Sequence, residues 1–336
     1  MRVSVSVRAF FQFFLHTQMM PILEGGEETL VGGQAVIEGV MMRAPHSYCV
    51  AVRKGNGEIV TGEKQLVRLS ERNRIYRFPL IRGVATLCQA MKLGYDALRF
   101  STNVAFDDLA AKDPKYQPKA ETKELPGWAM TGNLLFSAAF LILLYKFLPL
   151  FLVTKLSKAY PVFAGHLAFN GVDGGIRILI FLAFLYGVSR LKDMHRMFQY
   201  HGAEHKVVFN YEAGQPVTVE NAQRFTTFHP RCGTSFLMVL MFLAIPINAL
   251  IPFDAFWAKL VCRILLLPVT IGLSYELIRF AAKRPGSILS LVTAPGLWLQ
   301  RITTQPPAND QAEVAIRALD GAMTLEAAQG GELIIA

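Results

Sequence analysis

Two long stretches without a charged residue constrain the fold of this chain more than any other feature of its sequence. Between Glu124 and Lys146 lie 21 uncharged residues, and between Arg231 and Asp254 lie 22. A helix needs about 20 predominantly apolar residues to cross the hydrocarbon core of a bilayer. The chain of 336 residues is 52% apolar and only 18% charged, which is too apolar for an ordinary soluble protein of its size. The sequence therefore predicts an α-helical membrane protein.

We expect about four transmembrane helices within a membrane domain at residues 125–302. The first is predicted at about 129–153, and the third coincides with the second uncharged run. The second candidate has only 12 uncharged residues between Arg177 and Arg190. It therefore requires Arg177 to extend to the interface or to be partly buried in protein. A fourth span is predicted at about 260–278.

The distribution of Lys and Arg predicts the orientation of these spans. The segments before the third span and after the fourth are rich in Lys and Arg, whereas the loops on the other side hold only Lys155, Lys158 and Lys259. Because positive residues mark cytoplasmic loops, both termini are predicted to be cytoplasmic. The net charge of +9 is explained by residues that flank spans, so no nucleic-acid partner is expected.

A small β-rich cytoplasmic unit is predicted at residues 29–75. Glycines alternate with branched residues from Val31 to Pro45, which is typical of strands with tight turns. The sequence 54–57, Lys-Gly-Asn-Gly, is a hairpin signal between two further strands. Glu38 stands in an apolar setting. Either it pairs with Arg43 at the surface, or it serves as a ligand or acid/base group delivered to a distant site.

Three other regions complete the predicted domain organisation. Residues 1–28 are expected to be a poorly ordered N-terminus or to follow a misassigned start. Residues 76–124 are predicted to form an amphipathic helix, at about 79–101, and a charged linker. Residues 303–336 are expected to be a polar tail with one short helix at 313–319.

The strongest functional signal is the sequence His201-Gly202-Ala203-Glu204-His205. On a helix, imidazoles at positions i and i+4 project from one face, close enough for one metal ion to bind both. The order His-x-x-Glu-His is typical of inverted zinc-site helices, in which the carboxylate acts on water held by the metal. The pattern predicts His201 and His205 as ligands and Glu204 as the catalytic base. Alternatively, both histidines are ordinary polar residues on a helix that leaves the membrane.

A second pair of metal-binding residue types, His229 and Cys232, begins 24 residues after His205. No proline interrupts residues 176–213, so we expect one long helix to leave the membrane and to carry the first motif into the cytoplasm. The second pair directly precedes the third span. Both clusters are therefore predicted to meet at the cytoplasmic membrane face, where either His229 or Cys232 supplies a third ligand.

Three motifs together resemble the YqhQ-like family of bacterial membrane proteins. They are Gly32-Gly33-Gln34-Ala35-Val36-Ile37-Glu38-Gly39-Val40-Met41-Met42-Arg43, the histidine motif through Lys206, and His229-Pro230-Arg231-Cys232-Gly233-Thr234-Ser235-Phe236. The resemblance covers roughly residues 29–320. It implies a metal-dependent enzyme in the bacterial cytoplasmic (inner) membrane, but it implies no particular reaction or substrate.

The leading hypothesis is a membrane-embedded hydrolase that uses one divalent metal, most simply zinc, with an open fourth position. The expected partners are the lipid bilayer and an unknown substrate. A structural metal clip is the alternative, and it requires His201, His205, His229 and Cys232 to bind together and leave no open position. Thiol catalysis by Cys232 and a scaffold role without metal are the remaining possibilities.

Overall fold

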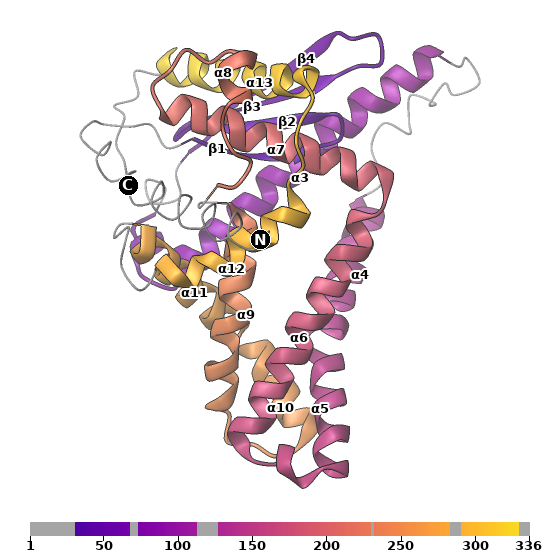
Figure 1. Ribbon diagram of the computed structural model, residues 1–336, viewed down its shortest axis with the longest axis vertical. Coiled ribbons are helices and arrows are strands. Elements are labelled where there is room, and N and C mark those ends of the chain that lie inside the picture. The colour runs from indigo at the N-terminus through magenta and orange to yellow at the C-terminus, as the bar shows by residue number, and fades with distance from the viewer. Residues whose placement is uncertain (1–30, 68–72, 113–126, 230–231, 283–289, 329–336) are drawn as a thin grey trace, which may run out of the picture.

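The computed structural model describes residues 31–67, 73–112, 127–229, 232–282 and 290–328. A small sheet with helices packed on it lies at one end, and a group of long apolar helices extends away from it (Figure 1). The predicted combination of apolar helices with a small N-terminal sheet is therefore confirmed. The predicted N-terminal segment 1–28 lies outside the described residues.

The sheet has four antiparallel strands in the order β1-β2-β3-β4. The strands are β1 (Gly32–Val36), β2 (Gly39–Arg43), β3 (Ser47–Arg53) and β4 (Ile59–Gln65). The predicted hairpin joins β3 to β4, with Arg53 opposite Ile59. Gly57 has φ +91, a conformation that glycine adopts without steric cost. The β-rich unit thus follows from alternating residues and turn chemistry.

Both faces of the sheet are covered, because successive strand residues point to opposite sides. On one face, side chains such as Met42, Cys49 and Ala51 pack against helices α7 (Lys192–Glu212) and α13 (Asn309–Ala328). On the other face, Met41 and Val50 pack against helix α3 (Ile81–Lys112). Helix α3 extends past the predicted end of the amphipathic helix into the charged segment, of which residues 113–126 lie outside the described chain.

The predicted C-terminal tail forms a long helix, α13, that belongs to the core of this unit. Its buried alanines, including Ala315, Ala318 and Ala322, allow it to approach the sheet closely. Near its end, Glu326 accepts hydrogen bonds from the backbone N–H of His46 at 2.8 Å and from the hydroxyl of Ser47 at 2.9 Å. The carboxylate also contacts Nδ1 of His46 at 2.8 Å. These contacts fix the helix end to the start of β3.

Substituting Glu326→Gln should destabilise the protein by about 1–3 kcal/mol, because a buried carboxylate then loses charge-assisted hydrogen bonds. The measurement is chemical denaturation of the wild type and the variant in the same detergent. The matched control is Glu313→Gln, whose carboxylate pairs with Arg53 at the surface and should change stability by less than about 1 kcal/mol. Equal effects of the two substitutions would contradict this account.

The same contacts make the stability of this region depend on pH. Burial acts to raise the pKa of Glu326, but the donors of His46 and Ser47 outweigh it and lower that pKa below its ordinary value of 4.5. The stabilisation is therefore fully present above pH 4.5 and is lost as the pH falls through the folded-state pKa. Glu326→Gln should remove this part of the acid sensitivity.

Within the described residues, two helices are long and apolar enough to cross a membrane, Leu135–Ala159 and His166–Ser189. A pair of helices bent by 47°, α10 (Phe256–Leu265) and α11 (Leu267–Ala282), makes a third if it is one span. Helix α9 (Gly233–Ala249) is apolar but shorter. These candidates agree with the predicted apolar segments. The predicted total of about four transmembrane helices stays a prediction.

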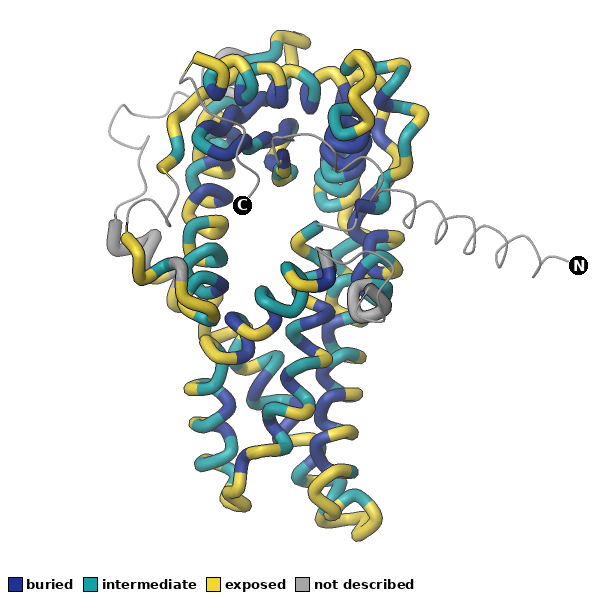
Figure 2. Tube along the Cα trace, turned by 90° about the vertical axis from the view of Figure 1, so that its left-hand side faces the viewer, coloured by how far each residue is buried: buried dark blue, intermediate teal, exposed yellow. Residues whose placement is uncertain are grey.

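The first candidate span is built from α4 (Gly127–Ile142), a π-helical turn at Leu143–Phe147 and α5 (Leu148–Ala159). The second is α6 (His166–Ser189). Exposed positions recur along these helices in Figure 2, and many are large apolar side chains such as Phe136, Leu167 and Leu179. Exposed apolar surface of this extent is typical of contact with lipid.

The prediction of one long helix across residues 176–213 is wrong. Helix α6 ends at Ser189, and α7 begins at Lys192 after Leu191, which is extended at φ −74 and ψ 132. Asp193 in the first turn favours a new helix N-terminus there. Because of this break, α7 turns away from the apolar helices and lies across the sheet (Figure 1).

The remaining described elements are one longer helix and a few short ones. Helix α12 (Ser290–Thr303) packs against α9. The other short elements are a 3-10 turn at Arg74–Arg77, a 3-10 turn at Pro161–Phe163 and helix α8 (Val219–Gln223).

Candidate metal centre

Helix α7 and the segment before α9 bring three of the four predicted metal ligands together. His201 and His205 lie one turn apart on α7, with ring centroids 4.5 Å from each other. Cys232 is the residue directly before α9, and its Sγ lies 3.2 Å from Nε2 of His201. One donor atom from each of these three residues lies within 4.8 Å of the other two.

Both histidine rings are held by backbone carbonyl groups. Nδ1 of His201 lies 2.8 Å from the carbonyl oxygen of Thr303, and Nδ1 of His205 lies 2.5 Å from that of Thr227. A carbonyl oxygen only accepts hydrogen bonds, so we assign the proton of each neutral ring to Nδ1. Each Nε2 then carries the lone pair of its ring and faces the Cys232 thiol group. Metal-binding histidines are commonly oriented by a partner in this way.

His229 lies beside this group but outside it. Its ring centroid is 5.6 Å from that of His205 and 4.5 Å from that of Phe209. Its Nε2 lies 3.4 Å from Oε2 of Glu212. Its backbone is fixed by Gln300, which accepts from the N–H and donates to the carbonyl, each at 2.7 Å. Of the two residues predicted to supply a third ligand, Cys232 is the one that joins the group.

Glu204 is buried on the side of α7 that faces strand β1. The backbone N–H of Gly33 donates a hydrogen bond to this carboxylate. Its Oε2 has no hydrogen-bond partner among the described residues. A Cβ at Gly33 would lie 2.9 Å from Cγ of Glu204, so only glycine allows this approach. Burial raises the pKa of Glu204, and electrostatic interaction with His201 and His229 opposes that rise.

The donor set fits a zinc ion. Burial lowers the pKa of His205, and it lowers the pKa of His229 to about 4, so both rings are neutral near pH 7. Neutral imidazole is the form that binds metals. Two imidazoles and one thiolate are a ligand combination that zinc takes in proteins.

Sequence reasoning missed the residues that hold the site in shape. The chain at Gln305 crosses α7 at Gly202, and a Cβ there would lie 2.0 Å from the Gln305 carbonyl oxygen. The Gln305 N–H also donates to the carbonyl of Phe198 at 2.9 Å. A glycine inside a helix was the available signal, because its helical propensity is poor. The carbonyls of Thr227 and Thr303 left no signal in the sequence, since any residue carries one.

Glu38 does not belong to the centre. Its carboxylate forms a bidentate ion pair with Nε and Nη2 of Arg196, and Nη2 lies at 2.6 Å. It also accepts a hydrogen bond from the Tyr200 hydroxyl at 3.2 Å. Glu38 therefore forms a surface ion pair, which was one of the two predicted alternatives. Its partner is Arg196, so the predicted partner Arg43 was wrong. Glu38 has φ +51 in the turn between β1 and β2, and this turn directs it toward α7.

Comparison with known proteins places this chain in a family. Residues 78–325 match a family model described as "Protein of unknown function (DUF1385)". The chain belongs to the DUF1385 family. It is also 34% identical over 303 residues to "Uncharacterized protein YqhQ" of Bacillus subtilis (strain 168), which covers 88% of this chain and 93% of that protein. The predicted relationship to YqhQ-like proteins is thereby confirmed. No solved structure matches the chain.

The DUF1385 match includes every member of the candidate metal centre, since all four predicted ligands and Glu204 lie within residues 78–325. Strands β1 to β4 lie before it. Gly33, which contacts Glu204, is therefore outside the DUF1385 match although it completes the site. Neither the family description nor the name of the relative assigns an activity.

Proposed function

We propose that this DUF1385 protein is a metal-dependent hydrolase of the membrane, with its site where α7 meets α9. His201, His205 and Cys232 hold one divalent ion, most simply zinc, and Glu204 is the general base. The observation that carries the proposal is the group of three donor atoms within 4.8 Å, drawn from two separate segments. A divalent ion in this place supplies a Lewis acid to a substrate carbonyl or phosphoryl group.

The protein residues have separate tasks in this proposal. The carbonyls of Thr303 and Thr227 hold the two imidazoles with Nε2 available for the ion. Glu204 is buried against β1, where water is largely excluded, and its Oε2 is available to accept a proton. A divalent ion nearby would favour the ionised form of Glu204, which is the form that accepts a proton.

A structural metal clip is the second candidate, and one observation favours it. The three donors join α7, which packs on the sheet, to the start of α9, so an ion there would fasten the two parts of the molecule. A closed site requires a fourth protein ligand. The structure favours the open site, because His229 lies outside the donor group with its Nε2 beside Glu212.

Substituting Glu204→Gln should separate these two candidates. For the hydrolase, zinc content is unchanged and zinc-dependent hydrolysis falls by about 10²–10⁴-fold, the usual contribution of a positioned general base. Zinc is measured by mass spectrometry, and hydrolysis is followed with a p-nitrophenyl ester and a quenched fluorescent peptide. Glu220→Gln, an exposed carboxylate on α8, is the matched control. Hydrolysis by the Glu204 variant at the wild-type rate would reject the role of Glu204.

We also propose that the chain crosses the bacterial inner membrane four times, with both termini and the metal centre on the cytoplasmic side. In support, the α5–α6 connection and the α9–α10 connection both lie at the end of the molecule opposite the sheet (Figure 1). Exposed aromatic residues gather at that end, including Tyr160, Phe253 and Trp257. Aromatic side chains are enriched where helices leave the bilayer.

Cysteine labelling at single introduced sites tests this topology. Cysteines at Gly62 and Gly214 should be labelled only after the inner membrane is permeabilised, whereas one at Ala164 should react in intact spheroplasts. Labelling of Gly62 and Gly214 from opposite sides would reject four spans. Labelling of Ala164 only from the cytoplasm would reject the first two spans.

A further inference from the structure

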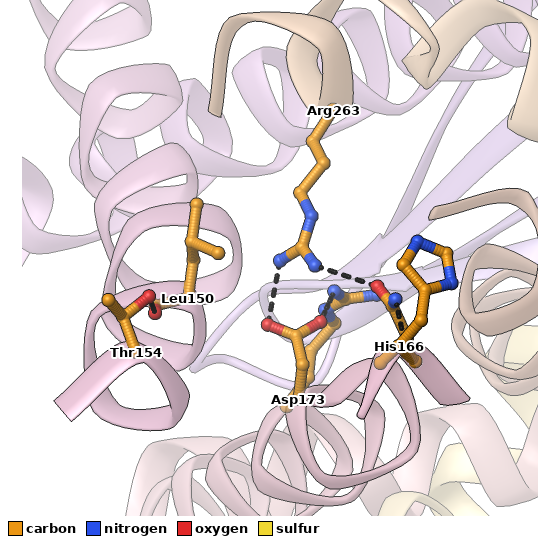
Figure 3. Close-up of polar contacts among 7 residues, drawn as sticks. Leu150, Thr154, His166, Asp173 and Arg263 are labelled. Carbon is orange, nitrogen blue, oxygen red and sulfur yellow. Dashed lines mark hydrogen bonds and ion pairs between the residues drawn. The ribbon is translucent and has the colours of Figure 1, made fainter. Parts of the chain in front are cut away.

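The apolar helices enclose four ionisable side chains on elements that contribute no residue to the metal centre. Asp173 and Arg263 are each 1% exposed, Arg177 is 3% exposed and Lys146 is 8% exposed. They come from three elements, the π-helical turn, α6 and α10. Figure 3 shows Arg263 directed at Asp173 between these helices. Ionisable residues placed inside apolar helices are costly and commonly have a function.

Each oxygen of the one carboxylate accepts a hydrogen bond from one of the two arginines. Nη2 of Arg177 donates to Oδ2 of Asp173 at 2.5 Å, and Nη1 of Arg263 donates to Oδ1 at 2.7 Å. Nη2 of Arg263 also donates to Oδ1 of Asn170 at 3.2 Å. Lys146 lies within electrostatic reach of both arginines and of Asp173. Asp173 therefore faces two guanidinium groups and the amino group of Lys146.

The charges of this cluster do not cancel. Asp173 balances one of the two arginines, so one positive charge remains in excess, and Lys146 adds a second when it is protonated. No other carboxylate occurs in the sequence of α4, α5, α6, α9 or α10 or of the π-helical turn. The further cations of α5 and α10 are Lys155, Lys158 and Lys259, and Lys259 is paired with Asp254. Glu276 on α11 is paired with Arg82. The excess is thus not neutralised by the described helices.

Hydrogen-bond donors in the cluster also exceed the acceptors. Nε and Nη1 of Arg177 and Nε of Arg263 are buried and have no hydrogen-bond partner among the described residues. A buried donor without a partner is destabilising, and more so when it is charged. The π-helical turn adds Lys146 to the same cluster. Single π-turns within α-helices are frequent at functional sites.

We propose that Lys146, Arg177 and Arg263 form a binding site for an oxyanion, with Asp173 holding the two guanidinium groups in position. Planar guanidinium groups bind phosphate and carboxylate through paired hydrogen bonds. An oxyanion neutralises the excess charge and supplies acceptors for the unpartnered donors at once. The bound oxyanion is either the phosphate group of an anionic lipid or a free oxyanion such as inorganic phosphate. This site is separate from the metal centre and does not depend on it.

The test uses the full-length protein in phosphatidylcholine nanodiscs, with thermal unfolding followed as inorganic phosphate is added. Wild-type protein should gain melting temperature in a saturable manner if it takes a free oxyanion. In nanodiscs that contain phosphatidylglycerol, it should be stabilised without added phosphate if it takes a lipid phosphate. Arg177→Gln and Lys146→Met should each weaken the response by about tenfold or more, because each removes a charged partner of the anion.

Lys146→Met keeps the test valid if the Arg177 variant does not fold, since both ion pairs of Asp173 stay intact in it. Lys158→Gln removes an exposed cation from the adjacent α5 and should respond as the wild type does. Two results would overturn the proposal. One is a wild type that neither phosphate nor phosphatidylglycerol stabilises, and the other is a Lys146→Met variant that responds as strongly as the Lys158→Gln control.

Discussion

Replacing His201 and His205 together with alanine should abolish zinc binding by the purified protein. Removal of an outer partner of a metal ligand alone costs up to about 100-fold in affinity, so the loss of two direct ligands should exceed that factor. The remaining donor of the group, Cys232, cannot hold zinc alone. Zinc is measured by mass spectrometry after purification without chelator.

The matched control exchanges two exposed histidines, His166→Ala with His195→Ala, and should retain wild-type zinc. Zinc at the wild-type level in the His201 and His205 double variant would show that the metal binds elsewhere. It would also remove the basis for the proposed hydrolase and for the metal clip.

Cobalt substitution identifies the third ligand in the same preparation. The wild type should show sulfur-to-cobalt charge transfer in the near ultraviolet. Cys232→Ser should lose that absorption, and His229→Ala should keep it, because only Cys232 belongs to the group of three donors. The opposite pattern would assign the third position to His229.

The second large effect is expected in the apolar helices, where Asp173→Asn should destabilise the protein by about 3–5 kcal/mol. This is the usual cost of removing one partner of a buried ion pair, since the other partner is left as an uncompensated charge. Here the change leaves Arg177 and Arg263 without their common carboxylate. The measurement is chemical unfolding in nanodiscs or detergent at one fixed anion concentration.

The control for this prediction is Asp254→Asn, a fully exposed carboxylate that pairs with Lys259 at 3.5 Å. It should change stability by less than about 1 kcal/mol. Adding Lys146→Met to Asp173→Asn should restore part of the loss, because one excess cation is then removed. A loss below about 1 kcal/mol for Asp173→Asn would show that the carboxylate does not hold these charges.

Local patterns explain why much of the fold could be predicted. The β3–β4 hairpin followed from Lys54-Gly55-Asn56-Gly57, because turn residues act within a few positions of the chain. The apolar helices followed from runs of uncharged residues. The break between α6 and α7 was missed, because a glycine such as Gly187 also occurs inside helices, and Leu191, where the chain leaves the helix, is neither glycine nor proline.

The sequence predicted the ligand types of the candidate site and the approach of its two ligand clusters, but not the arrangement of the side chains. The spacing of His201 and His205 fixed their common face, because a helix turns once in 3.6 residues. The spacing also placed Glu204 beside them, but it did not show that this carboxylate is buried against Gly33. The sequence left open whether Cys232 or His229 supplies the third ligand. The two residues lie three positions apart on a loop, where the relative direction of side chains is not fixed.

The sequence by itself determined the class of molecule, a chain of apolar helices with a small sheet and two clusters of metal-binding residue types. These properties arise from composition and short-range periodicity, which act over a turn or a strand. Tertiary structure alone decided which individual atoms meet: Sγ of Cys232 with Nε2 of His201, the carbonyl of Thr303 with Nδ1 of the same ring, and the guanidinium of Arg263 with the carboxylate of Asp173. Such contacts depend on how helices break and pack, and no local pattern records the direction of a side chain after the chain has turned.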